Sequence, residues 1–377
     1  MQMDLHQRYG FTPVINARGT FTPLGVSRSS RQVGDAVAAA LGGFFVIDEL
    51  LAAVSREIAG VSGAEAATVT HCAAAGITLA VAAAMAGSDP ERIAALPDAS
   101  GMPDRVVLPA GHAVDYGHPI VTDIRLAGAT PVMAGRPDAC SIDDIESALA
   151  HERTACLLLV SSRLVGGAEV DLAQAVAAAR RRGVPAIIDG AAQDLRLERL
   201  LATDADLVVL SAQKYLAAPT AGLIVGRADL VQACRAQERG IGRAMKPTKE
   251  AVVGVLAALQ ERRDLDLEAW SARQHRKLAG FIEQAGRVPG LQASAVPDPT
   301  GLPFARACLS VVRGAGRRDA AALARALRAG TPSIWLMDHQ AADGRLMLEL
   351  VPLDDREIQV ILGRLAELLA APPGEAV

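Results

Sequence analysis

The sequence contains few aromatic residues, few cysteines and no strong excess of charge. Tryptophan, tyrosine and phenylalanine make up 3% of the 377 residues, although 51% of the chain is hydrophobic. A core of alanine, valine, leucine and glycine suits helices packed closely on a sheet better than an aromatic-rich β-sandwich. The net charge of −4 gives no electrostatic reason to expect nucleic acid or an anionic membrane as a partner.

The five cysteines are scattered, odd in number and never in CxxC spacing. This pattern fits neither a disulfide framework nor a zinc site and indicates a reducing compartment. The seven histidines show no metal-ligand spacing, so we expect no metal. The Ala-rich run 68–87 is too short and too broken to cross a membrane, and the first residues lack the features of a signal peptide. We therefore expect a soluble, cytoplasmic protein.

Motifs of several enzyme classes are also missing. No Gly-x-Gly-x-x-Gly follows the first expected strand, and the chain has no Walker loop, Gly-x-Ser-x-Gly elbow or His-Glu-x-x-His pair. The dinucleotide-binding, P-loop, α/β-hydrolase and zinc-protease classes therefore have no support.

Short apolar runs alternate with helical segments through the first two thirds of the chain. Strands are expected at 67–70, 105–108, 130–133, 155–160, 186–188, 207–210 and 222–225. Helices are expected at 73–86 and 171–182. Continuous apolar strands separated by helices predict an α/β fold whose mostly parallel sheet is covered on both faces.

The pattern changes after Thr248. Long helices are expected at 250–263 and 268–285, followed by strands at 307–312 and 345–350 and helices at 320–329 and 355–371. We therefore divide the chain into an N-terminal arm (1–35), a large domain (36–245) and a smaller C-terminal α+β domain that includes the connecting helix (246–377).

An acidic residue follows one of the buried strands. Asp189 comes directly after 186–188, and an unpaired carboxylate there is costly because it is withdrawn from water. A protonated pyridine nitrogen would be a suitable partner, since the carboxylate would keep that nitrogen charged and the ring able to accept electrons. The alternatives are a cap for the next helix or a contact to a metal-bound water.

The next strand is followed by a lysine. Only four of the 38 basic residues are lysines: Lys214, Lys246, Lys249 and Lys277. Because nearly every cation is arginine, a lysine at a strand end predicts amine chemistry that a guanidinium cannot perform. Lys249 and Lys277 lie in charged helical stretches and are expected to be solvated, and Lys246 is a weaker candidate. The alternative for Lys214 is an exposed loop lysine.

Two further segments lie at strand ends. Small residues at 72–76 would let an anion approach the free N–H groups of the helix that begins there, with the Ser211 hydroxyl adding a donor. His112 follows the strand at 105–108, where its imidazole could stack on a planar ring. Taken alone, small residues also permit tight packing, and a single histidine is more often structural.

Together these motifs resemble the fold-type I pyridoxal-phosphate (PLP) enzymes. The segments IIDGAA (187–192) and SAQK (211–214) carry the resemblance. Within that family, the segments INARGTFTPLG (15–25), GHAVDYG (111–117), PTAG (219–222) and RAMKPTKE (243–250) are similar to the selenocysteine synthase and D-glucosaminate-6-phosphate ammonia-lyase-like branch. The resemblance covers roughly residues 8–260 in order along the chain. Two departures, His71-Cys72 and Ala212-Gln213, suggest a reshaped pocket.

The resemblance implies a fold-type I PLP-dependent transferase fold and a role for each motif. Lys214 would hold the cofactor as a Schiff base, Asp189 would contact the pyridine nitrogen and His112 would stack on the ring. The residues expected to surround the phosphate and the ring are Cys72, Ala73, Ala74, Ala191 and Ser211. It also implies a homodimer or larger homo-oligomer with each active site at a subunit interface.

The chemistry expected at this site begins with removal of the substrate Cα proton by Lys214. The resemblance favours an ammonia-lyase or dehydratase type of β-elimination on a small amino acid or amino sugar acid. A racemase or epimerase and then an aminotransferase are the alternatives, and a non-catalytic PLP-binding relative is an alternative of another class. A substrate carboxylate favours a bidentate arginine, for which Arg18, Arg243 and Arg345 are the candidates.

Overall fold

The chain forms two compact units, which we describe from a computed structural model of residues 5–167, 169–312 and 318–370. The larger unit comprises residues 29–265. The smaller unit combines residues 1–28 with residues 266–377. Both ends of the chain therefore belong to the same unit.

One sheet organises the larger unit. Its described strands follow the order β2 (Ala66–Thr70), β8 (Gly222–Gly226), β7 (Leu207–Ser211), β6 (Ala186–Asp189), β5 (Thr154–Val160), β3 (Arg105–Pro109) and β4 (Thr130–Ala134). The strands from β7 to β4 are parallel, whereas β8 is antiparallel to both β2 and β7. The predicted α/β fold with a mostly parallel sheet is confirmed.

Successive residues of the central strands pack on opposite faces of the sheet. In β5, Leu157 and Leu159 join one apolar core, while Leu158 and Val160 join the other. Because both sides are covered, these strands have no polar face, which explains their continuous apolar sequences.

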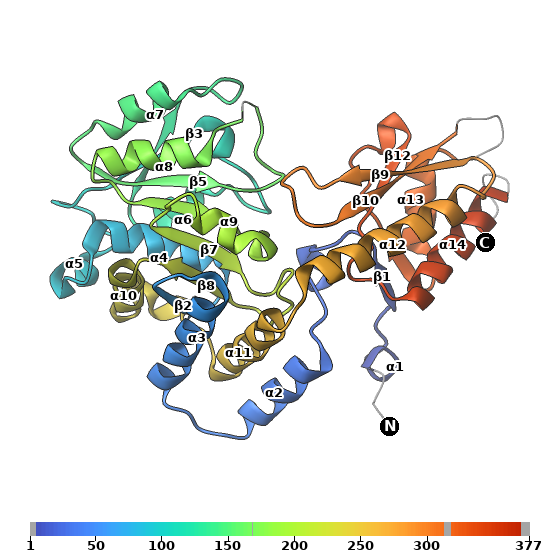
Figure 1. Cartoon of the computed structure of the whole chain (residues 1–377), viewed down its shortest axis with the longest axis horizontal. Helices are drawn as coiled ribbons and strands as arrows, with labels where there is room; N and C mark the ends of the chain where they lie inside the picture. The colour runs from blue at the N-terminus through green and yellow to red at the C-terminus, as the bar shows by residue number, and fades with distance from the viewer. Residues whose placement is uncertain (1–4, 168, 313–317, 371–377) are drawn as a thin grey trace. The chain divides into compact units, whose positions relative to one another are not determined.

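Helices cover both faces of this sheet (Figure 1). One face carries α4 (Ala73–Ala86), α5 (Pro90–Ala95), α6 (Val121–Leu126) and α10 (Ala228–Ala236). The other carries α2 (Arg31–Leu41), α3 (Ile47–Ser62), α7 (Ile142–Leu149), α8 (Leu172–Arg181), α9 (Leu197–Leu201) and α11 (Lys249–Arg263). Short 3-10 turns η2 (Ala110–His112), η3 (Asp194–Arg196), η4 (Gln237–Arg239) and η5 (Ile241–Met245) follow several elements.

Helix α4 is buried along most of its length and consists largely of alanine and glycine. A Cβ at Gly76 would come 2.8 Å from Cγ1 of Val209 on β7, so only glycine permits this approach of helix and sheet. The small residues of α4 therefore bring its first turn close to the strand ends.

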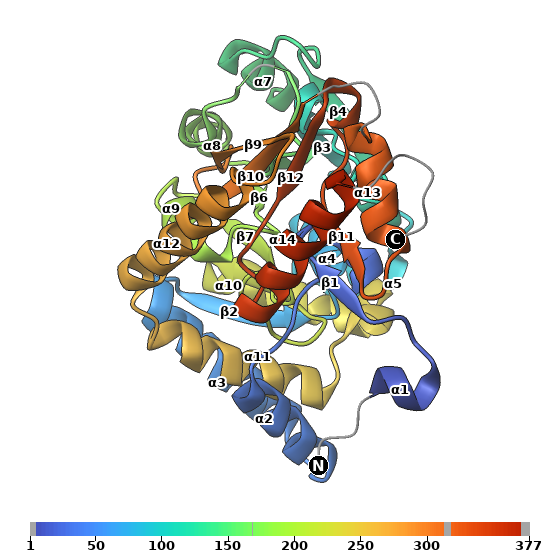
Figure 2. The same ribbon diagram turned by 90° about the vertical axis from the view of Figure 1, so that its right-hand side faces the viewer.

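The described residues of the smaller unit form two short sheets (Figure 2). Strand β10 (Ala305–Val311) pairs antiparallel with β9 (Leu291–Pro297) and β12 (Arg345–Leu348), while β1 (Val14–Asn16) pairs in parallel with β11 (Ser333–Trp335). The helices are α1 (Leu5–Tyr9), α12 (Leu267–Ala285), α13 (Ala320–Ala329) and α14 (Asp355–Ala370), with 3-10 turns η1 (Thr22–Leu24) and η6 (Ala341–Asp343).

The two compact units do not follow the domain boundaries expected from the sequence, which lie at residues 35 and 245. Helix α11 packs on α2 and α3 and so belongs to the larger unit. The N-terminal arm belongs to the smaller unit because β1 pairs with β11, which follows it by more than 300 residues. Among the described residues, no helix is long and apolar enough to cross a membrane.

Candidate functional site

The candidate site lies where β6 and β7 end. These strands are parallel neighbours, with Asp189 in register with Val209. The N–H of Ser211 donates to the carbonyl of Ala191 at 3.0 Å, so the two loops that follow also run side by side. This arrangement brings Asp189 and Lys214 to the same edge of the sheet.

Asp189 is a buried carboxylate, 5% exposed. Its Oδ1 accepts a hydrogen bond of 3.0 Å from the Ala191 N–H. Burial raises the pKa of Asp189 to about 6, and the charge of Lys214 opposes that rise. Because an ionised carboxylate in this position is poorly solvated, the site favours a cation close to it.

Lys214 is half-buried in the loop after β7. Burial lowers the pKa of its amine, Asp189 and Asp194 raise it, and Arg163 lowers it further. A lysine whose pKa is depressed in this way has more of the neutral amine that nucleophilic and base chemistry require.

The first turn of α4 forms a cradle close to these loops. Cys72 precedes α4, and its side chain makes no capping hydrogen bond to the first N–H groups of the helix. Gly222 packs against this turn so closely that a Cβ would come 2.5 Å from the Cys72 carbonyl and 2.8 Å from the Ala73 nitrogen. Helix N–H groups left without a side-chain cap are suited to an anion such as a phosphate.

His112 is buried near Asp189. Its Nδ1 accepts a hydrogen bond of 2.9 Å from the N–H of Val160, the β5 residue in register with Asp189. The hydrogen is therefore on Nε2. Burial lowers the pKa of His112 to about 4, so the ring is neutral at physiological pH and is suited to stacking on a cationic ring.

A buried carboxylate, an imidazole and an anion-accepting helix N-terminus lie at strand ends on the same edge of the sheet as the loop that carries Lys214. This set of groups fits a planar, protonated pyridine that carries a phosphate, since each charge of that cofactor has a complementary group. Ala73, Ala74, Ala191 and Ser211 are placed by the same elements, and their cofactor contacts remain predictions.

A hydrogen-bonded group at Tyr116 was not predicted from the sequence. The Tyr116 hydroxyl donates to the buried carboxylate of Asp123, and Nε2 of His118 lies 3.1 Å from both of them. Burial raises the pKa of Tyr116, and the charges of Asp123, Asp189 and Cys72 raise it further. The sequence segment GHAVDYG contains Tyr116, but nothing in the sequence pattern indicates that its hydroxyl would bond to Asp123 on α6.

The arginine candidates for the substrate carboxylate lie in different parts of the fold. Arg243 is exposed on η5, whose Met245 carbonyl accepts from the His71 N–H and the Thr70 hydroxyl beside the cradle. Arg18 and Arg345 lie in the smaller unit, paired with Asp338 at 3.2 Å and Asp343 at 3.7 Å.

Arg163 was not among the residues predicted from the sequence. It is exposed in the loop after β5, the strand next to β6, and its charge lowers the pKa of Lys214. A basic residue at a strand end was the available signal, but it was hidden among 34 arginines (38 basic residues less four lysines).

The expectation that Lys249 and Lys277 are simply solvated was wrong. Lys249 donates to the carbonyls of Ala40, Leu41 and Gly43, at 2.5, 3.1 and 2.8 Å. Lys277 donates to the carbonyls of Leu350 and Leu353, at 3.2 and 2.9 Å. Both ammonium groups satisfy backbone carbonyls at the ends of other segments, which a helical charge pattern does not indicate.

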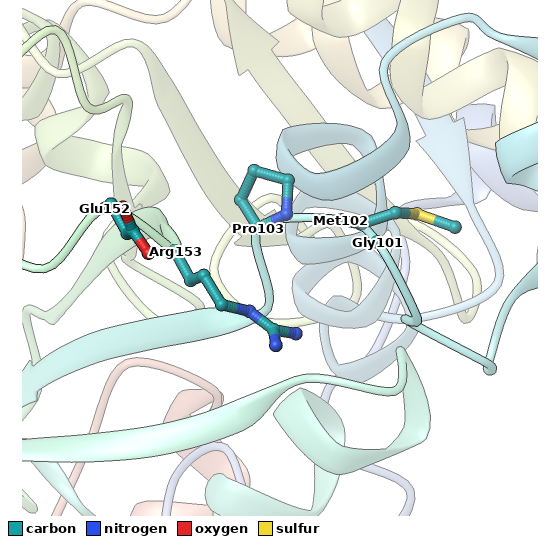
Figure 3. A pocket seen from close by; sticks show the side chains of 5 residues that line it. All are labelled: Gly101, Met102, Pro103, Glu152 and Arg153. Atoms are coloured by element: carbon teal, nitrogen blue, oxygen red, sulfur yellow. The ribbon is translucent and has the colours of Figure 1, made fainter.

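The larger unit has a further surface pocket that does not include the candidate site residues (Figure 3). It lies where β3 and β5 begin, at the edge of the sheet opposite Asp189, and is lined by Gly101, Met102, Pro103, Glu152 and Arg153. Arg153 is paired with Asp104 at 2.9 Å. Among the described residues, no group of histidine, cysteine and acidic side chains is arranged to hold a metal ion.

Comparison with known proteins agrees with this geometry. Residues 123–260 match the family model for aminotransferase class-V. The chain is 38% identical to the 5'-C-glycyluridine monooxygenase-decarboxylase of Streptomyces sp over 98% of this chain and 94% of that protein. It is 35% identical to the D-glucosaminate-6-phosphate ammonia lyase of Salmonella typhimurium over 98% of each.

Solved structures support the same family and fold. The structure of a D-glucosaminate-6-phosphate ammonia-lyase superposes with a TM-score of 0.88 at 35% identity, covering 98% of this chain and all of the other. Serine palmitoyltransferase of Sphingomonas wittichii, at 16% identity and a TM-score of 0.59 over 94% of this chain and 86% of that one, shares the fold. The chain therefore belongs to the fold-type I PLP-dependent enzymes, in the branch related to D-glucosaminate-6-phosphate ammonia-lyase.

Proposed function

We propose that this protein is a PLP-dependent lyase that removes the Cα proton of an amino acid or amino sugar acid and eliminates a β-substituent. The observation that carries the proposal is the juxtaposition of Lys214 and Asp189 at the ends of β7 and β6. The similarity to the ammonia lyase over nearly the whole of both chains supports elimination as the outcome.

Each residue of the site has a defined task in this proposal. When bound, PLP supplies an electron sink that stabilises negative charge at the substrate Cα. Lys214 is the covalent attachment point and, once released, accepts the Cα proton at Nζ. Asp189 holds the proton on the ring nitrogen, and His112 lies against the ring face. The N–H groups of Ala73 and Ala74 and the Ser211 hydroxyl bind the phosphate.

We propose a substrate with a hydroxylated, sugar-derived skeleton. The names of both near-full-length relatives describe an amino-acid function on such a skeleton, glucosaminate in one and a glycyl group on uridine in the other. Arg163 and Arg243 are the arginines of the larger unit that we assign to the anionic groups of this substrate.

A second candidate function is decarboxylation coupled to consumption of oxygen. The observation that favours it is the 38% identity to the Streptomyces monooxygenase-decarboxylase. Both functions use the same cofactor-binding residues, so they differ in what the substrate loses, which a product assay can measure.

The test of cofactor use is the absorbance of the purified protein. We expect a near-visible band that borohydride abolishes and that Lys214→Ala lacks. The control is Lys246→Ala, because Lys246 is exposed at the end of η5. A band that persists in Lys214→Ala would contradict the proposal.

The test of reaction type is a product assay on D-glucosaminate 6-phosphate and a panel of hydroxylated amino acids. A lyase releases ammonia and a keto acid without an added acceptor. Oxygen uptake with carbon dioxide release would establish the second candidate instead. Deuterium uptake at Cα without net product would indicate a racemase, and a strict need for a keto-acid acceptor would indicate an aminotransferase.

We also propose that the protein works in the cytoplasm as a homo-oligomer. All five cysteines are free, which suits a reducing compartment. Residues 41–47 run from the last residue of α2 to the first residue of α3 and expose five large apolar side chains: Leu41, Phe44, Phe45, Val46 and Ile47. A cluster of this kind on a surface is typical of a protein contact. We call residues 41–47 the apolar tip.

A further inference from the structure

Two arginines of the smaller unit share one carboxylate. Arg18 follows β1, and its Nη1 lies 3.2 Å from Oδ1 of Asp338. Arg328 lies in the last turn of α13, and its Nη2 is 2.9 Å from Oδ2 of the same residue. The two guanidinium groups together outweigh this carboxylate by one positive charge. We call Arg18, Arg328 and Asp338 the arginine cluster.

Each guanidinium of the arginine cluster also lies on an aromatic ring. Cζ of Arg18 is 4.1 Å from the ring centroid of Phe21, and Cζ of Arg328 is 4.3 Å from that of Trp335. The two rings are neighbours, with centroids 6.2 Å apart. A ring that covers one face of a guanidinium fixes its plane and leaves the N–H groups at its edge to bind an oxyanion.

The backbone that carries Arg18 is held in place on both sides. Oδ1 of Asn16 accepts a hydrogen bond of 3.0 Å from the Arg18 N–H, and Nδ2 of Asn16 donates to the Gly19 carbonyl at 2.9 Å. Gly19 has a φ of +80°, and a Cβ there would come 2.6 Å from the carboxylate of Glu349. Only glycine therefore permits this turn, which fixes the point from which the Arg18 side chain leaves the chain.

The ring beneath Arg328 is held as well. Nε1 of Trp335 donates to Oγ of Ser333 at 2.9 Å, and that hydroxyl donates to the Arg328 carbonyl at 2.6 Å. The end of α13 and the strand β11 are therefore joined directly at the arginine cluster. Guanidinium groups that are fixed before a ligand arrives lose less entropy when they bind it.

Most N–H donors of the arginine cluster are unused. Within the described ranges, the guanidinium groups of Arg18 and Arg328 donate to Asp338 alone, although each has several N–H groups. Nε of Arg328 is buried and has no described partner. An unpaired buried donor costs free energy, and half-exposed ion pairs stabilise a fold little, so stability alone does not account for the cluster.

We propose that Arg18 and Arg328 form a binding site for a small oxyanion, the phosphate or carboxylate group of an organic acid or free phosphate. The excess positive charge attracts such a group, and its oxygens accept from the edges of both guanidinium groups, as the Asp338 carboxylate does. The three side chains are 25%, 37% and 33% exposed in the order Arg18, Arg328 and Asp338, so an anion can reach them from solvent. The proposal goes beyond the lyase reaction and does not depend on it.

The test uses Trp335 as a reporter in the full-length, cofactor-loaded protein, so that added anions do not compete for the cradle at α4. The chain has two tryptophans, and 5-fluorotryptophan labelling gives one ¹⁹F NMR signal for each. Trp270→Phe identifies the Trp335 signal. With ionic strength held constant by sodium chloride, we expect inorganic phosphate to shift the Trp335 signal with a dissociation constant on the order of 1–10 mM.

Arg18→Gln and Arg328→Gln should each raise this dissociation constant by roughly tenfold or more, because each removes a charged donor. Arg18→Lys keeps the charge but loses the planar guanidinium, and should bind phosphate more weakly than wild type and more tightly than Arg18→Gln. An unchanged Trp270 signal reports that each variant is folded. The matched control is Arg287→Gln, since Arg287 is an exposed arginine of the same unit that pairs with Glu283.

Acetate and D-gluconate 6-phosphate distinguish the sources of the oxyanion. A shift with inorganic phosphate at a similar affinity would identify a site for a free anion. A shift that requires D-gluconate 6-phosphate would identify a site for an organic acid that carries the group. No saturable Trp335 shift with any of the three, or an equal loss of affinity in Arg287→Gln, would overturn the proposal. Absence of turnover would instead contradict the proposed function, because the NMR titration measures binding alone.

Discussion

Gly222 lies directly against the peptide that joins Cys72 to Ala73. A Cβ at position 222 would come 2.5 Å from the carbonyl carbon and oxygen of Cys72. On β8, Gly222 is in register with Thr70 of β2 on one side and Ser211 of β7 on the other. The antiparallel strand β8 therefore positions both the start of α4 and the end of β7.

Gly222→Ala is expected to displace the cradle. The added methyl group must push the Cys72–Ala73 peptide away, which costs about 1–3 kcal/mol of stability. We expect at least a roughly tenfold rise in the cofactor dissociation constant, since tenfold corresponds to about 1.4 kcal/mol. Absorbance titration with PLP measures it. The control is Gly60→Ala on an exposed part of α3, where nothing lies within 4 Å and binding should be unchanged.

Asp189 makes the cofactor-free protein less stable as the pH rises. Its folded pKa, about 6, exceeds the ordinary value of 3.8, so the folded state binds the proton more tightly than the unfolded state does. The free energy of unfolding is therefore highest below pH 4 for this group, falls between pH 4 and 6, and is lower by about 3 kcal/mol above that range.

Asp189→Asn removes this dependence. Its unfolding free energy should exceed that of cofactor-free wild type at pH 8 and approach it at pH 4, as urea denaturation at both pH values can measure. Cofactor should bind the variant weakly and support turnover reduced by about 100-fold or more. Equal wild-type and variant stabilities at pH 8 would contradict the burial effect.

Lys249 stabilises the end of α2. Its ammonium donates to three carbonyls at the point where α2 gives way to the apolar tip. Lys249→Ala should therefore lower the free energy of unfolding by about 1–3 kcal/mol, because these carbonyls lose a charged donor. Lys246→Ala, three residues earlier and exposed, should change stability little. Thermal unfolding of the two variants side by side makes the comparison.

The apolar tip should govern assembly. Phe44 is fully exposed and Val46 largely so, and a self-associating surface would bury both. We expect Phe44→Ser/Val46→Ser to shift sedimentation velocity toward the monomer. Val296→Ser, on an exposed position of β9, is the control. If the double variant sediments as wild type does, the tip is not part of the interface.

Much of the larger unit could be predicted from sequence because its elements are locally encoded. The continuous apolar runs of β5 and β7 and the alanine-rich α4 match their expected ranges to within a residue or two. Lys214 and Asp189 could be proposed from the sequence because Asp189 ends a buried strand and Lys214 lies in the loop just after one, where a charged residue is unusual.

The features that were missed depend on partners distant in sequence. The pairing of β1 with β11 joins segments more than 300 residues apart, and the contact of Lys249 with α2 spans more than 200 residues. The antiparallel orientation of β8 was not predicted. A strand buried on both faces has the same apolar sequence pattern whether it runs parallel or antiparallel to its neighbours.

The smaller unit is interrupted by the larger one between residues 28 and 266. During synthesis, β1 emerges before any residue of the larger unit, yet its partner β11 begins only after residue 332. The larger unit is complete by then and can fold as soon as it leaves the ribosome. The N-terminal strand must therefore remain unpaired until the last part of the chain is made, so the order in which this enzyme assembles follows from the pairing of β1 with β11.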